Sequence, residues 1–68
     1  MNNTLDPTQI GKKLALLRGE KTRREVSTAL GISESALAMY EAGERIPRDN
    51  VKIRIADYYG KTVSWIFF

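Results

Sequence analysis

The chain has 68 residues, a formal net charge of +3, and no Cys or His. A chain of this length forms one small domain, and we expect a single domain over residues 1–68 with residues 1–5 flexible. Without Cys or His it has no disulfide, no thiolate nucleophile, and neither the commonest general base nor the commonest metal ligand. We therefore predict no metal, no cofactor and no enzymatic activity.

Nothing in the sequence predicts export or membrane insertion. The first residues lack the charged lead and apolar run of a secretory signal. The longest apolar stretch, Val63–Phe68, is interrupted by Ser64 and is too short to span a bilayer. We expect a cytoplasmic protein with no membrane partner and no small-molecule ligand.

The charges fall into blocks along the chain. Residues 12–24 carry six basic side chains and one acidic one, residues 25–44 carry four acids and no base, and residues 45–54 carry four bases and one acid. Two basic blocks thus flank an acidic middle. Charge alone fits an anionic partner and a set of solvated surface charges equally well.

The first predicted helix begins at Pro7, because Asp6 can cap it and Gln9 completes a capping box. Its apolar residues recur at the spacing of one helical face: Ile10, Leu14 and Leu17.

The second predicted helix follows a capping box at Thr22–Glu25 and ends at Gly31. The third is capped by Ser33 and ends at Gly43. The apolar residues that continue these two helices are Val26, Ala29 and Leu30 in the second, and Ala36, Leu37 and Tyr40 on the inward side of the third.

Pro47 bars the third helix from continuing, so a fourth begins at Arg48 or Asp49 and ends at Tyr59 before Gly60. Thr62 caps a short fifth helix. The predicted inward residues are Val51, Ile55 and Tyr59, then Val63, Ile66 and Phe67. With no strand signal in the chain, the predicted fold is all-α, with five short helices around one core.

The second and third helices are joined only by Gly31-Ile32-Ser33, a short glycine-containing turn typical of helix-turn-helix motifs. The stretches TRREVSTALGISESALAMYEAGERIP and NVKIRIADYYGKTVSWIF resemble the phage repressor and Cro-type (XRE-type) helix-turn-helix family, from about Ile10 to Phe67. The resemblance implies a lambda-repressor-like fold. It also implies a sequence-specific regulator of transcription that acts on double-stranded DNA as a repressor-like switch.

In that family the outward side of the third helix enters the major groove. The base-reading positions match Glu34, Ser35, Ala38 and Met39. Glu can accept a hydrogen bond from cytosine N4, Ser can donate or accept, and Ala or Met can contact a thymine methyl. Two alternatives stay open: Glu34 as an acid stabilised by the helix dipole, and Met39 as a loose surface residue.

The resemblance assigns phosphate contacts to the flanks of the reading helix. The candidates are Arg23, Arg45 and Arg48, followed by Lys21, Arg24, Lys52 and Ser33. Arg23 stands where the family often has Gln. Arg54 and Lys61 are expected on the solvated surface, while Lys12 and Lys13 are left undecided. A structural ion pair between Glu41 and Arg18 is also implied, although the loop from Arg18 to Thr22 is shorter than in many relatives.

The C-terminal segment is rich in aromatic residues, with five of them within residues 58–68. We expect Tyr59 and Phe67 in the core, and Tyr58, Trp65 and Phe68 at a homodimer interface. A two-fold dimer would bind a palindromic operator. The alternative is a protein-interaction module on the same fold, an antitoxin or partner-docking domain whose aromatic patch is the working surface.

Overall fold

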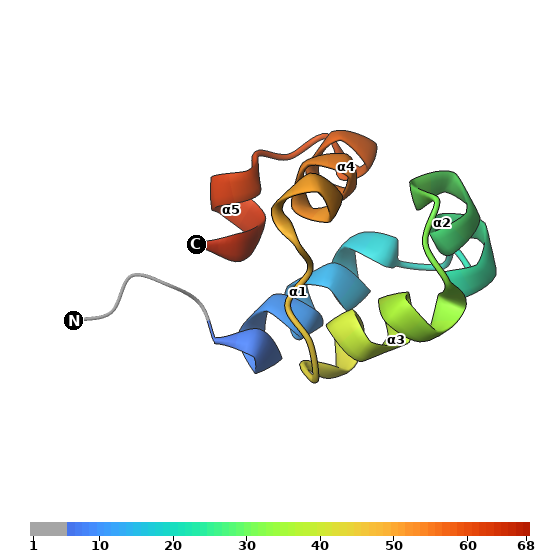
Figure 1. Cartoon of the computed structure of the whole chain (residues 1–68), viewed down its shortest axis with the longest axis horizontal. Coiled ribbons are helices and arrows are strands. Elements are labelled where there is room, and N and C mark those ends of the chain that lie inside the picture. Colours follow the sequence, from blue (N-terminus) through green and yellow to red (C-terminus); the bar gives the residue numbers. More distant parts are fainter. Residues whose placement is uncertain (1–5) are drawn as a thin grey trace.

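The computed structural model describes residues 6–68, and the predicted flexible segment 1–5 lies outside them. The described residues form five α-helices and no strand, which confirms the predicted all-α fold. Their bounds are α1 Pro7–Arg18, α2 Arg23–Leu30, α3 Glu34–Ala42, α4 Asp49–Tyr59 and α5 Val63–Phe67 (Figure 1).

Four of these helices begin with a side-chain cap, because a polar oxygen accepts the backbone N–H three residues further on. The caps are Asp6, Thr22, Ser33 and Thr62. The capping box at Asp6 is complete, with Gln9 returning a hydrogen bond to the Asp6 N–H. At α2 only half of the predicted box forms, the bond from the Glu25 N–H to Thr22 Oγ1. α4 begins after Arg48 with no side-chain cap.

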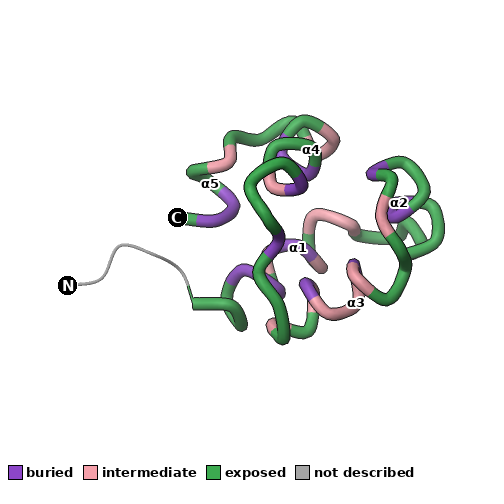
Figure 2. The backbone as a smooth tube through the Cα atoms, viewed as in Figure 1, coloured by how far each residue is buried: buried purple, intermediate pink, exposed green. Residues whose placement is uncertain are grey.

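Every helix contributes to the core (Figure 2). The largest fully buried side chains are Leu14, Val26, Leu37, Ile55, Ile66 and Phe67. Tyr59, predicted inward, is only partly buried but packs against this core, as do Leu17, Ala36 and Val63. Ala56 on α4 is also buried, which was not predicted. Burial of this apolar set supplies most of the stability of a chain without disulfides.

α3 is held closely against α1 (Figure 1). Gly11 of α1 is buried there, and a Cβ at this position would lie 2.8 Å from the Tyr40 carbonyl oxygen and closer still to that of Glu41. At the end of α3, Gly43 adopts φ +77° and faces the Thr8 backbone, to which an added Cβ would come within 2.9 Å. These two glycines let the helices approach until their backbones touch, which determines the position of α3.

α5 lies away from α2 and α3, packed on α4 and α1 (Figure 1). Of the helices that the described residues form, none combines the length and the apolar character needed to cross a bilayer.

Candidate nucleic-acid interface

The outer side of α3 carries the four residues predicted to read bases. Glu34 and Ser35 are exposed and Ala38 and Met39 are partly exposed. Leu37 and Tyr40 face the core. This division follows from helical periodicity, because residues three and four apart lie on one face.

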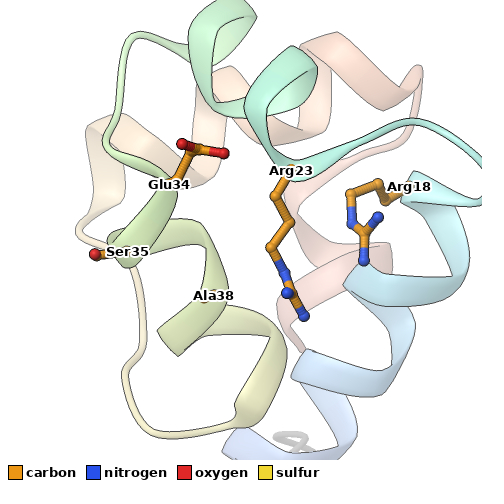
Figure 3. Close-up of a pocket in the computed structure, with 5 residues that line it drawn as sticks. All are labelled: Arg18, Arg23, Glu34, Ser35 and Ala38. Carbon is orange, nitrogen blue, oxygen red and sulfur yellow. The ribbon is translucent and has the colours of Figure 1, made fainter.

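A shallow hollow lies beside this face, lined by Arg18, Arg23, Glu34, Ser35 and Ala38. Figure 3 shows the Glu34 carboxylate at one end and the two guanidinium groups at the other, with Ala38 on α3 across from the Arg23 guanidinium. The Ser35 hydroxyl points away from the guanidinium groups, so Ser35 forms the rim (Figure 3). Met39 is not among the lining residues.

The Glu41 carboxylate joins α1, α2 and α3. Its side chain is 2% exposed. Arg18 donates to it from Nε at 2.7 Å and from Nη2 at 3.0 Å, and Arg23 donates from Nε at 3.0 Å. Charge-assisted hydrogen bonds of this kind are shorter and stronger than neutral ones.

The short loop after α1 does not prevent the pairing of Arg18 with Glu41. Arg18 Nη1 also donates a hydrogen bond of 2.7 Å to the Lys21 carbonyl oxygen in this loop. Every nitrogen of the Arg18 guanidinium thus donates to a protein acceptor. The hydrogen bond with Glu41 raises the pKa of this guanidinium, against the opposing effect of burial.

Arg23, a predicted phosphate contact, is thus partly engaged within the protein. Its Nε is bound to Glu41, while Nη1 and Nη2 bind no other described residue. The side chain remains 49% exposed. Sequence reasoning paired Glu41 with Arg18 alone, because nothing local marks a second arginine 18 residues away as a partner.

The segment between α3 and α4 presents two arginines of a different kind. Arg45 and Arg48 are exposed, and within residues 6–68 neither side chain forms a hydrogen bond or an ion pair. Arg48 immediately precedes the helix that lacks a side-chain cap. Uncapped N–H groups and the positive end of the helix dipole favour an anion at such a position.

The remaining predicted phosphate contacts differ in how they are engaged. The Lys21 ammonium donates 3.1 Å to Tyr58 Oη, and that of Lys52 lies 3.8 Å from the Asp49 carboxylate. Ser33 Oγ accepts the Ala36 N–H as the cap of α3. Arg24 is exposed, and its side chain has no hydrogen-bond or ion-pair partner among residues 6–68.

Two residues expected on the solvated surface have specific contacts. Arg54 Nη1 donates 2.9 Å to the Leu30 carbonyl oxygen, so it ties α4 to the end of α2, where α-helices leave carbonyls unsatisfied. Lys61 Nζ lies 4.7 Å from the centroid of the Trp65 ring. Lys13, left undecided from the sequence, lies 4.6 Å from the same ring and donates 2.7 Å to the Trp65 carbonyl oxygen.

The three residues predicted at a dimer interface have different surroundings. Trp65 and Phe68 are 49% and 54% exposed. Tyr58 is partly buried against Tyr59 and Lys21. Sequence reasoning missed Ile53, which is 54% exposed and forms an apolar hollow with Phe68 and Val63. The sequence offered one signal for this, because Ile53 does not fall on the helical face that carries Val51 and Ile55.

Tyr59 carries a buried hydroxyl that has no hydrogen-bond partner among the described residues. Burial, with smaller contributions from the charges of Glu41 and Tyr58, raises the pKa of Tyr59 to about 12.

Comparison with known proteins agrees with this architecture. A family model described as Helix-turn-helix matches residues 12–66, which is most of the chain. No curated protein and no solved structure gave a match. The chain therefore belongs to the XRE-type helix-turn-helix family, the family of Cro and the phage repressors, and is a DNA-binding regulator of that type.

Proposed function

We propose that the protein is a repressor-like switch that binds a palindromic operator in double-stranded DNA as a homodimer. The observation that carries this proposal is the uncovered outer face of α3 next to Arg45 and Arg48, whose side chains have no partner within residues 6–68. Sequence readout needs an accessible helix face such as that of α3, and affinity for a polyanion needs unpaired basic side chains such as those of Arg45 and Arg48.

In this proposal α3 enters the major groove. Glu34 accepts from cytosine N4, Ser35 donates to or accepts from a base edge, and Ala38 and Met39 contact thymine methyl groups. None of these contacts needs a basic residue, so an acidic reading helix is compatible with binding to DNA.

Phosphate contacts come from the two flanks of α3. Arg45, Arg48 and Arg24 are exposed and have no ion-pair partner among the described residues, which makes them the principal clamps. Lys21 and Lys52, which lie beside the rings of Tyr58 and Phe67, add long-range attraction.

The dimer forms through the exposed side chains of Trp65, Phe68 and Ile53, of which Phe68 and Ile53 line one hollow. Exposed apolar side chains that gather on one part of a small protein mark an interaction surface. A two-fold contact there would present two copies of α3 about 34 Å apart, to successive turns of the major groove.

The proposal is tested by selecting duplexes from a random pool with the purified protein and titrating the best one over a range of salt. If each protomer neutralises about four phosphates, the log–log slope for the dimer lies near −7, at about −0.9 per phosphate. Affinity that does not change with salt contradicts DNA binding. It would favour the alternative, a protein-interaction module (antitoxin or partner-docking domain) that uses the exposed aromatic residues.

Sedimentation tests the dimer separately. Phe68→Ser removes an exposed apolar side chain, so it should shift a dimer toward monomer without unfolding the protein. A wild-type protein that stays monomeric both alone and on the selected duplex refutes the homodimer.

A further inference from the structure

We propose that Arg23 and Glu34 together read one G·C base pair, with the Arg23 guanidinium on guanine and the Glu34 carboxylate on cytosine. This inference rests on the proposed function and gives Arg23 a different role from the phosphate contact predicted from the sequence. It follows from the arrangement of donors, acceptors and charges in the hollow beside α3.

Arg23 enters the hollow with a preset orientation. Its Nε donates 3.0 Å to Glu41 Oε1, and the carboxylate of Glu41 is itself held by Arg18. The two nitrogens left over, Nη1 and Nη2, form the end of a planar fork whose side chain is 49% exposed. Such a fork matches two acceptors on one edge of a base.

Arg18 lines the same hollow but cannot perform this role. Its Nε and Nη2 are bound to Glu41, and its Nη1 is bound to the Lys21 carbonyl oxygen. Arg23 is therefore the guanidinium in this hollow with nitrogens to spare.

Glu34 supplies the opposite chemistry at the other end (Figure 3). It is the first residue of α3, is exposed, and forms no ion pair within residues 6–68. Ala38, which lines the hollow on the α3 side, has a side chain of one carbon, so it leaves space for a flat group to enter.

The charges around the hollow exclude a phosphate as its best ligand. The two positive charges of Arg18 and Arg23 are cancelled by the negative charges of Glu34 and Glu41. A phosphate would find no net positive charge there and would meet the Glu34 carboxylate. A neutral group that presents acceptors at one end and a donor at the other fits both ends of the hollow.

A G·C pair presents that pattern in the major groove, with O6 and N7 of guanine as acceptors and N4 of cytosine as a donor. A T·A pair in the same orientation offers Arg23 one acceptor, thymine O4, instead of two. A reversed C·G pair turns the donor toward the guanidinium and the acceptors toward the carboxylate. The expected order of preference is therefore G·C, then T·A, then C·G.

The experiment uses the duplex selected with the wild-type protein and two base analogues. At one G·C position, 7-deazaguanine, which lacks N7, should lower wild-type affinity by about tenfold, and a cytosine analogue without the 4-amino group should lower it by about fivefold. Arg23→Lys keeps the charge beside Glu41 but has one nitrogen, which cannot bind both Glu41 and the two acceptors of guanine. This variant should therefore lose most of its sensitivity to 7-deazaguanine. Glu34→Gln keeps an oxygen that can accept from cytosine N4 but loses the charge, so its response to the cytosine analogue should be weaker. Glu34→Ala, which has no acceptor, should become insensitive to it.

Two matched variants serve as controls. Arg48→Lys changes a proposed phosphate contact and should shift the affinity for every duplex by the same factor. Glu44→Gln removes an exposed carboxylate just beyond α3 and outside the hollow, and should keep both analogue effects. Thermal unfolding of each variant confirms that it is folded.

Two results would overturn the inference, and they are distinguishable. If the selected duplex has no position at which both analogues act, or if Arg23→Lys and Glu34→Gln shift all duplexes alike, the paired readout is wrong while DNA binding stands. If no duplex is selected over the random pool, sequence-specific DNA binding fails and the inference fails with it.

Discussion

Two pairs of arginines near α3 differ in what they contact. Arg18 and Arg23 converge on the buried carboxylate of Glu41. Arg45 and Arg48, in the segment between α3 and α4, are exposed, and their side chains have no hydrogen-bond or ion-pair partner within residues 6–68. The same residue type thus holds helices together on one side of α3 and stays available on the other.

The difference shows how a small protein can separate geometry from affinity. A carboxylate with little solvent access holds its arginines in one arrangement, because its charge must be neutralised within the protein. Removing either partner leaves a poorly solvated charge. Exposed arginines contribute little to stability but attract a polyanion over a distance of about 10 Å at moderate salt. We therefore expect substitutions in the first pair to act on folding and base preference, and substitutions in the second to act on affinity alone.

The largest expected effect is that of Glu41→Gln, which leaves two guanidinium groups without their carboxylate. It should lower the free energy of unfolding by about 3 kcal/mol, measured by urea denaturation. Glu44→Gln, a change of the same kind at an exposed neighbour, should stay within about 0.5 kcal/mol of wild type. Equal losses from the two changes would mean that the Glu41 cluster does not hold the helices.

Gly11→Ala tests whether the cluster depends on the close approach of α1 and α3. The added methyl group meets the Tyr40 and Glu41 carbonyl oxygens, so the helices must separate. The free energy of unfolding, measured by urea denaturation, should fall by about 2 kcal/mol despite the better helix propensity of Ala. Lys12→Ala, at an exposed position of the same helix, is the control and should be close to neutral.

Arg48→Ala and Arg45→Ala test the exposed pair. Each should leave the urea midpoint nearly unchanged and lower affinity at low salt by about tenfold, equivalent to about 1.4 kcal/mol. If one phosphate contact per protomer is lost, the log–log salt slope of a dimer becomes shallower by about 2. A change in base preference would contradict the assignment of these arginines to phosphates.

The smallest expected effect is that of Tyr59→Phe, beside the charge of Glu41. The hydroxyl is buried without a partner, so its removal should raise the free energy of unfolding by up to about 1 kcal/mol. The pKa of Tyr59 is about 12 in the folded protein against 10.0 ordinarily. The wild type should therefore lose stability relative to the variant as pH rises from 10 to 12, because the unfolded state releases this proton first.

Tyr58→Phe is the matched control for this measurement. It removes a hydroxyl that accepts a hydrogen bond from Lys21 Nζ at 3.1 Å, so it should not gain stability at neutral pH. Equal gains from the two substitutions would show that the missing hydrogen bond of Tyr59 is not the cause.

The helices and most of the core could be predicted from the sequence, because their causes lie within a few residues. Asp6, Thr22, Ser33 and Thr62 each bond to a backbone N–H three residues away, and the glycines that end α2, α3 and α4 act at their own positions. The outer face of α3 follows from the same periodicity. The burial of Ala56 was missed because this residue lies at the edge of the helical face that carries Val51 and Ile55, where periodicity does not discriminate.

The partners of the long charged side chains were decided only by the tertiary structure. Arg23 binds Glu41 across 18 residues, Arg54 binds Leu30 across 24, and Lys13 binds Trp65 across 52. A lysine or arginine side chain is long and flexible enough to reach several acceptors, and which one it meets depends on how the helices cross. The sequence thus determined which residues are basic and which helix each one lies on. The packing of α1, α2 and α3 around Glu41 decided that Arg23 is held beside α3, while Arg45 and Arg48 stay exposed.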